Sequence, residues 1–261
     1  MREPSLFCRL FTYLYRYWRV FATGLSFAVF GLGGPVVAAL CALIFLLFPM
    51  RQGKRVRVSR AILRSTYTLY VNFMRALGLL SFEVKQIERL EKQPCIIIAN
   101  HPSLLDVVFL FSLVPNASCI VKRALFHNVF TRLPIRAAGY LANDDSELIK
   151  HARQVLEAGA PLIIFPEGTR STPGQPLRFQ RGVAHIALQL SCPILPVIAR
   201  CDPPTLLKGQ QWYQVPDRKP HFSMEFGELL DPSQFVDDQA MPSTQARQLT
   251  RGLQQWYEQR L

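Results

Sequence analysis

The strongest constraint on the fold of this 261-residue chain is a stretch of 31 residues, between Arg19 and Arg51, that carries no charged side chain. Apolar runs longer than about 18 residues are typical of membrane helices. As one straight helix the stretch would measure roughly 45 Å, whereas the hydrocarbon core of a bilayer is about 30 Å thick. Gly31, Gly33, Gly34 and Pro35 lie near its middle and favour a break there. We therefore predict either one kinked, tilted span or a two-segment re-entrant hairpin.

The charges around this stretch indicate how the chain meets a membrane. Residues 1–60 carry nine basic groups and one acid, which is +8 of the whole chain's formal net charge of +12. A basic segment beside an apolar run favours an anionic lipid surface over nucleic acid, for which the sequence has no binding motif. A secretory signal peptide does not fit, because the apolar run is too long and no small-residue cleavage site follows it. The richer basic flank after Arg51 places the rest of the chain on the cytoplasmic side of the inner membrane. The mixture of aromatic residues and arginines in residues 5–20 predicts an interfacial helix, although an ordinary helix packed on the domain is the alternative.

The remainder of the chain alternates short apolar runs with longer amphipathic stretches. After a helix predicted over 58–79, the strand candidates are Phe82–Ile87, Cys95–Ala99, Ser118–Val121, Tyr140–Ala142, Pro161–Phe165, Ile194–Ile198 and His221–Phe226. The helix candidates are Leu104–Leu113, Asp145–Glu157, Gly182–Gln189 and Thr244–Leu261, and residues 202–220 are expected to form a loop. This alternation predicts an α/β fold with a central, mostly parallel, mixed sheet flanked by helices. We divide the chain into a membrane anchor with the interfacial helix, 1–57, and an α/β domain, 58–261.

Two polar clusters directly follow predicted strands. Asn100 and His101 come after the strand Cys95–Ala99, and the segment 166–170 comes after the strand Pro161–Phe165. Sites in open parallel sheets form at the carboxyl ends of the strands, so we expect the two clusters to meet at one edge.

The first cluster pairs a histidine with an aspartate five residues later. Histidine accepts protons near neutral pH, and a carboxylate on its other ring nitrogen fixes the tautomer and stabilises the cation. Pro102 favours a helix start and Ser103 is a plausible N-cap, which would place Asp106 in the first helical turn, near the positive end of the helix dipole. His101 and Asp106 can therefore act as a general base and its orienting partner. The plainer alternative is a capping aspartate beside a surface histidine.

The second cluster, FPEGTRS at 165–171, combines a glycine turn with a carboxylate and a guanidinium. Arg170 can pair with a phosphate or carboxylate, Gly168 lets the backbone approach a ligand, and the N–H groups of the turn can hold an oxyanion. The alternative is a salt bridge between Glu167 and Arg170 that only ties the turn together. The chain has no GxSxG elbow, no phosphate-binding GxxxxGK[ST] loop and no cysteine or histidine spacing typical of zinc. This favours a base that deprotonates an acceptor hydroxyl directly, and the six scattered cysteines are interpreted as reduced thiols.

Four segments resemble motifs of the glycerolipid acyltransferases of the lysophosphatidic acid acyltransferase type. They are NHPSLLD (100–106), FPEGTRS (165–171), LRFQRGVAHIAL (177–188) and PILPVIA (193–199). The resemblance covers roughly residues 80–200 and implies transfer of a fatty acyl group, without an acyl-enzyme, from acyl-CoA or acyl-carrier protein to the hydroxyl of a lysolipid. It implies that His101 is the general base with Asp106 orienting it, and that no metal or other cofactor takes part. It further implies that the acceptor's glycerol and phosphate are bound by Glu167, Gly168, Thr169 and Arg170, with Lys122 meeting the phosphate.

One block departs from the family pattern. Where phosphatidic acid-forming members commonly show an arginine after a GxIFID segment, this chain reads GYLANDDSE (139–147), with two aspartates near the place of the missing cation. Loss of a cation and gain of negative charge should weaken phosphate binding there. A lyso-aminolipid is therefore a competing acceptor. A non-catalytic module that binds lipid or carrier protein, and a thioesterase that uses water as acceptor, are two further hypotheses.

Overall fold

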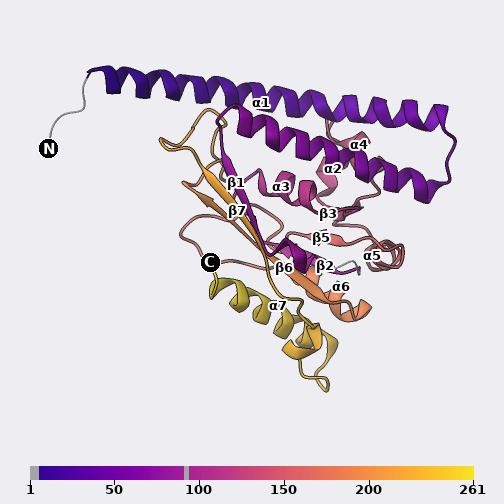
Figure 1. The fold of residues 1–261 in the computed structure, drawn as a ribbon. Helices are drawn as coiled ribbons and strands as arrows, with labels where there is room; N and C mark the ends of the chain where they lie inside the picture. Colours follow the sequence, from indigo (N-terminus) through magenta and orange to yellow (C-terminus); the bar gives the residue numbers. More distant parts are fainter. Residues whose placement is uncertain (1–5, 91–93) are drawn as a thin grey trace.

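A computed structural model describes residues 6–90 and 94–261, with side chains from Tyr13 onward. The N-terminal part is a pair of antiparallel helices, α1 (Leu6–Leu47) and α2 (Gln52–Ala76), and α1 runs along the entire top of the molecule in Figure 1. Residues 13–47 of α1 are long and apolar enough to cross a membrane. The predicted helix over 58–79 thus begins earlier, at Gln52, and the boundary drawn after residue 57 falls inside α2.

The break predicted near Gly31–Pro35 is wrong, because α1 is one continuous helix with Pro35 in its interior. The glycines have a packing role: a Cβ at Gly34 would overlap the carbonyl oxygen of Phe130, so glycine lets the backbones touch. Contacts with the rest of the chain between Tyr15 and Phe45 offset what a helix loses at an internal proline. The aromatic–arginine segment is the first part of the same helix and not a separate element. Ser5 and the side chains of residues 6–12 lie outside the described part.

The predicted sheet is confirmed. It is a seven-stranded sheet in the order β1-β7-β6-β2-β5-β3-β4, and every neighbouring pair is parallel except β6 with β7. The strands are β1 (Ser81–Lys85), β2 (Ile96–Ala99), β3 (Ser118–Val121), β4 (Leu141–Ala142), β5 (Leu162–Ile164), β6 (Ile194–Asp202) and β7 (His221–Phe226). The later helices are α3 (Asp106–Leu113), α4 (Arg132–Ala137), α5 (Leu148–Glu157), α6 (Gly182–Leu190) and α7 (Pro242–Glu258). Short 3₁₀ turns η1 (Ile87–Arg89), η2 (Arg123–Phe126) and η3 (Pro232–Phe235) complete the described elements.

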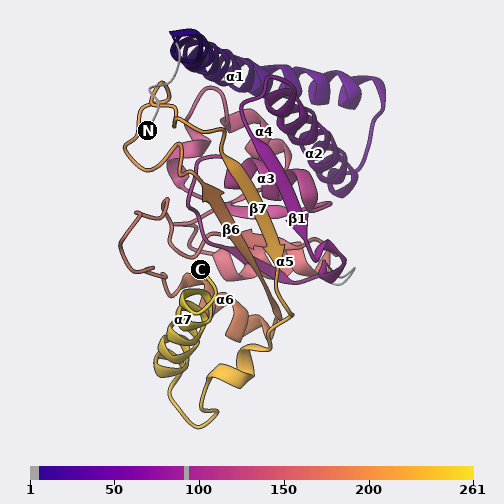
Figure 2. The ribbon, with the colours of Figure 1, turned by 60° about the vertical axis from the view of Figure 1, so that its left-hand side comes forward.

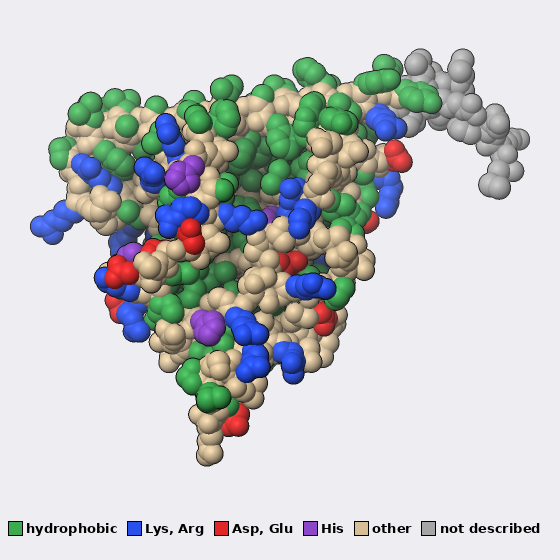
Figure 3. Space-filling view, turned by 180° about the vertical axis from the view of Figure 1, so that it is seen from behind, with side chains coloured by type: hydrophobic (Ala, Val, Ile, Leu, Met, Phe, Trp, Pro, Cys, Tyr) green, Lys and Arg blue, Asp and Glu red, His purple; other side chains and the backbone are tan. Residues whose placement is uncertain are grey.

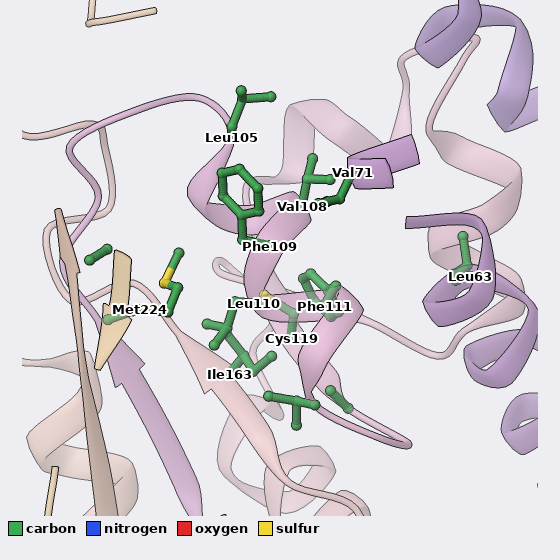
Figure 4. Close-up of a cluster of buried hydrophobic side chains, with 14 of the residues drawn as sticks. Leu63, Val71, Leu105, Val108, Phe109, Leu110, Phe111, Cys119, Ile163 and Met224 are labelled. Carbon is green, nitrogen blue, oxygen red and sulfur yellow. The ribbon is translucent and has the colours of Figure 1, made fainter. Parts of the chain in front are cut away.

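The sheet separates two apolar cores, because alternate strand residues point to opposite faces. Ile97, Ile163 and Leu195 pack toward α1, α2 and α3, whereas their neighbours Ile96, Leu162 and Ile194 pack toward α5, α6 and α7. In Figure 1, α1, α2 and α3 lie above the sheet and α6 and α7 lie below it, and Figure 2 shows the same fold from a second direction. Figure 4 shows the α3 side chains lying between the sheet and α2 in the first core. This three-layer arrangement fixes the strand ends on which the polar clusters stand.

Candidate active site

The two polar clusters meet at one edge of the sheet, as the strand pattern predicted. β2 ends at Ala99, immediately before Asn100 and His101, and its parallel neighbour β5 ends at Ile164, immediately before the segment 165–171. The backbone N–H of Ser171 donates to the carbonyl oxygen of His101 at 2.8 Å. The side chain of Asn100 secures the third neighbouring strand by bonding both backbone polar groups of Ala199 in β6, at 2.8 Å each. The clusters are therefore held rigidly against each other.

His101 and Asp106 form the expected pair. The Nδ1 atom of His101 lies 3.2 Å from Oδ2 of Asp106, and the histidine side chain is 13% exposed while the aspartate is fully buried. The same Oδ2 accepts a 2.6 Å hydrogen bond from the backbone N–H of Ser103. With Nδ1 facing the carboxylate, Nε2 is the ring nitrogen that remains for a reacting group.

The predicted N-cap at Ser103 is wrong. The helix α3 begins at Asp106, and the residue in the N-cap position is Leu105. The Ser103 hydroxyl donates to the carbonyl oxygen of Thr205 at 2.9 Å and accepts the backbone N–H of Leu105 at 3.4 Å, because residues 102–105 form bends and a turn before the helix starts. Asp106 does lie in the first turn of α3, as predicted.

Burial sets the electrostatics of Asp106. Desolvation raises the pKa of the Asp106 carboxyl, and the bonds from His101 and Ser103 only partly oppose this. Its second oxygen, Oδ1, is buried and has no hydrogen-bond partner among the described residues. The contacts of the carboxylate thus serve to orient the imidazole and the turn that carries it.

Glu167 ties the two clusters together. Its Oε1 accepts the backbone N–H of His101 at 3.0 Å and the hydroxyl of Ser171 at 2.8 Å. Burial raises the pKa of the Glu167 carboxyl against these bonds. A Glu167–Arg170 salt bridge, the structural alternative, is not formed in the described part of the chain, because the two side chains have different partners.

Arg170 is fixed by the loop that follows β6. Its Nη1 donates to the carbonyl oxygens of Leu206 and Leu207, at 2.8 Å each. Gly168 is exposed in the turn with φ +63°, a left-handed conformation that favours glycine, and Thr169 is half-buried beside it. Lys122 is exposed at the end of β3, which lies beyond β5 at the same sheet edge.

His101 also borders an apolar cavity of about 690 Å³ beneath α1. Its wall combines residues of α1, α2 and α3 with the loop after β6, among them Phe27, Phe30, Tyr67, Val108, Leu206 and Trp212. Figure 3, which views the molecule from behind relative to Figure 1, shows a hollow with apolar side chains inside and lysines and arginines around it. The imidazole thus faces a space that suits an apolar chain.

Sequence reasoning missed two parts of this wall. The loop at 202–220 was expected, but no sequence feature was used to place it at the site. The short helix α4, and Phe130 just before that helix, were not predicted at all. The exposed aromatic pair Trp212-Tyr213 in an otherwise polar loop was the available signal. Among residues 6–90 and 94–261, no group of three or more His, Cys, Asp or Glu side chains is placed to hold a metal ion.

Fold and site together define a three-layer α/β domain in which His101, paired with the buried Asp106, borders an apolar cavity under a long apolar helix. The acyltransferase family model matches residues 81–200. The chain is 31% identical over 145 residues to the 1-acyl-sn-glycerol-3-phosphate acyltransferase of Pseudomonas aeruginosa, covering 53% of this chain and 54% of that protein. It is 37% identical over 111 residues to the enzyme of the same name from Cocos nucifera, covering 40% and 36%.

The crystal structure of the 1-acyl-sn-glycerophosphate acyltransferase of Thermotoga maritima matches at a TM-score of 0.62 with 20% identity, covering 94% of this chain and 97% of that one, which shows a shared fold. The chain spans about half of the Pseudomonas aeruginosa relative's length, or about a third of the Cocos nucifera one's. Residues 81–200 match the acyltransferase family model, and the relatives that this part of the chain resembles are named 1-acyl-sn-glycerol-3-phosphate acyltransferases. The family recognised from the four motifs is therefore confirmed.

Proposed function

We propose that this protein is a membrane-bound O-acyltransferase that transfers a fatty acyl group from a thioester donor to the hydroxyl of 1-acylglycerol-3-phosphate or a related lysolipid. The observation that carries the proposal is the position of His101, held by a buried Asp106 and bordering a 690 Å³ apolar cavity. The names of the relatives support the reaction class. The donor is acyl-CoA or acyl-carrier protein as co-substrate, with no metal and no other cofactor.

In the proposed mechanism the neutral imidazole of His101 donates Nδ1–H to Asp106 and presents Nε2 as a base. Nε2 takes the proton of the acceptor hydroxyl while the hydroxyl oxygen attacks the thioester carbonyl carbon. This attack gives a tetrahedral oxyanion. Collapse forms the ester, breaks the C–S bond and returns the proton to the departing thiolate. No acyl-enzyme forms, so the chain needs no nucleophilic serine or cysteine.

Lys122 and Arg170 supply the cations proposed to bind the acceptor's phosphate, with the backbone of Gly168 and Thr169 beside them. Arg170 can do so while Nη1 stays on Leu206 and Leu207, because its other guanidinium nitrogens have no partner among the described residues. Glu167 is buried, so its contribution to acceptor binding is to hold the His101 backbone and the Ser171 side chain in place.

The segment 139–147, which differs from the family pattern, bears on which acceptor is used. Both aspartates already have basic partners: Asp144 lies 2.7 Å from Nε of Arg123, and Asp145 lies 2.7 Å from Nδ1 of His151. Arg123 thereby partly neutralises the negative charge of Asp144, which weakens the argument against a phosphate. An acceptor without phosphate, such as a lyso-aminolipid, is the second candidate, and it is favoured by the missing arginine in this block.

We further propose that the domain lies on the cytoplasmic side of the inner membrane and that α1 lies along the bilayer surface. One side of α1 contacts the domain from Tyr15, which bonds Gly78, to Phe45, which packs under Arg55. Its other side exposes large apolar residues, including Leu14, Tyr17, Phe21, Leu32, Val36, Leu43 and Leu46. A helix bound to a polar domain along its length inserts most favourably by its free side, within one leaflet.

The test is an assay of thiol release in mixed micelles, with acyl-CoA or acyl-carrier protein and either 1-acylglycerol-3-phosphate or a lyso-aminolipid, followed by mass spectrometry of the lipid product. We expect acceptor-dependent release, and His101→Ala should lower it by roughly 10²–10⁴-fold, the usual contribution of a general base. His185→Ala is the matched control and should retain activity. His185 lies on α6, which covers the sheet face that points away from α1, α2 and α3. Release without acceptor would identify a thioesterase, and binding of lipid without release a non-catalytic module.

A further inference from the structure

The loop at 203–220 contacts both motifs of the candidate site. Arg170 bonds the carbonyl oxygens of Leu206 and Leu207, and the backbone N–H of Leu104 donates to the Leu206 oxygen at 3.2 Å. The carbonyl oxygen of Thr205 accepts the Ser103 hydroxyl, so three consecutive loop residues, 205–207, direct their carbonyls toward the two clusters. Leu206 itself has φ +53° and a buried side chain on the cavity wall. A left-handed conformation at a leucine persists only where the surroundings hold it.

The other end of the loop is held by α1. Arg19 is 2% exposed, and its Nη1 donates to the carbonyl oxygen of Pro216 at 2.6 Å. Further along α1, Gly24 lies under Trp212 so closely that a Cβ would be 3.0 Å from the indole ring. Both contacts join the membrane-associating helix to the loop.

Side chains inside the loop connect these two ends. The Gln210 amide accepts the backbone N–H of Leu207 at 2.9 Å and donates to the carbonyl oxygen of Gln214 at 2.9 Å. The Gln214 side chain in turn accepts the N–H of Gln211 at 2.8 Å. Because the loop is braced internally, a restraint at Pro216 also restrains the carbonyls at 206 and 207.

We propose that Arg19 is a positioning residue for the acceptor headgroup: it holds the loop 203–220 against α1 so that Leu206 and Leu207 fix the guanidinium of Arg170. The inference rests on the proposed acyl transfer and assigns α1 a role beyond membrane attachment. Arg170 keeps Nε and Nη2 for an anionic group of the acceptor only while Nη1 is held by the two carbonyls.

The test compares Arg19→Met with Arg16→Met, which removes an equal charge from an exposed position about one turn earlier in α1. For the purified full chain in mixed micelles, Arg19→Met should raise the KM for the lysolipid about tenfold, equivalent to about 1.4 kcal/mol. The KM for the acyl donor, and binding to vesicles that contain anionic lipid, should stay unchanged. Arg16→Met should behave as the original chain. An unchanged lysolipid KM in Arg19→Met would overturn the assignment.

A second measurement does not depend on activity. Hydrogen exchange at the Leu104 amide, which donates to Leu206, reports directly on the contact between the loop and the first motif. We expect about tenfold faster exchange in Arg19→Met and a change in the same direction in Trp212→Ala. Trp212 is 43% exposed and belongs to neither core, so its truncation leaves both cores intact. Unchanged exchange in both variants would refute the coupling. A lack of acyl transfer by the original chain would instead refute the proposed function alone.

Discussion

At the scale of single residues, two buried acids hold the candidate site in shape at a cost in stability. Asp106 orients His101 and Ser103, and Glu167 joins His101 to Ser171. Burial raises the pKa of both carboxyls, so each folded acid binds its proton more tightly than it does in the unfolded chain. The stability that this tighter binding provides is present at low pH and is lost as the pH rises through the raised pKa values.

Asp106→Asn should therefore separate activity from stability. The amide cannot stabilise the imidazolium, and acyl transfer should fall on the order of 10³–10⁴-fold. Because asparagine has no charge to bury, the variant should be more stable to unfolding than the original chain at about pH 7, and the difference should shrink toward about pH 4. Thermal unfolding in detergent at the two pH values measures this. Equal stability at both, or retained activity, would contradict the assigned role of the carboxylate.

At the scale of elements, α1 shows how packing overrides local sequence. Its glycines and internal proline favour a break, yet the helix is continuous from Leu6 to Leu47 because it rests on the domain. At Gly34 an added Cβ would lie on the carbonyl oxygen of Phe130, whereas at Gly33 an added Cβ would meet nothing within 4 Å. The two adjacent glycines are thus a natural matched pair.

Gly34→Ala should destabilise the protein by roughly 1–3 kcal/mol, because a backbone oxygen, unlike a flexible side chain, cannot move aside without shifting the segment before α4. Gly33→Ala should leave stability unchanged or raise it by up to about 1 kcal/mol, through the higher helix propensity of alanine. Thermal unfolding of both variants in the same detergent is the measurement. Equal effects would mean that α1 does not contact Phe130 as closely as the structure places it.

At the scale of the whole molecule, charge and apolar surface act on the same partner. The chain carries a formal net charge of +12, and the free side of α1 exposes large apolar side chains between Leu14 and Leu47. Coulombic attraction to anionic lipid is screened within about 10 Å at 0.1 M salt, whereas insertion of apolar side chains is not screened.

Binding to vesicles should accordingly have two components. We expect weaker association with anionic vesicles when the salt concentration rises from about 0.1 M to about 1 M, but not full release. Association with purely zwitterionic vesicles should be weaker and nearly independent of salt. Flotation assays measure both. Complete release at high salt would show that α1 does not insert.

Local patterns in the chain were enough to predict the sheet and the His101–Asp106 pair. All seven strands were predicted, because short apolar runs bounded by polar turns leave little choice of conformation, and β3 and β7 match their predicted bounds. Strand ends also predicted that His101 and the segment 166–170 would meet, since parallel neighbours deliver their carboxyl ends to one edge. The structure extends β6 to Asp202 because Cys201 and Asp202 pair with β7, which a single-strand pattern does not reveal.

The course of α1, the cavity and the partners of Arg170 depend instead on how the chain packs. Whether a helix with an internal proline continues depends on the surface that it meets, and a cavity exists only where α1, α3 and a loop some hundred residues later come together. The carbonyls of Leu206 and Leu207 carry no side-chain signal at all, yet they fix the guanidinium of Arg170. Periodicity and motifs record local preferences and residue types, whereas these features are contacts between segments that lie far apart in the sequence, which become defined only when the chain has packed.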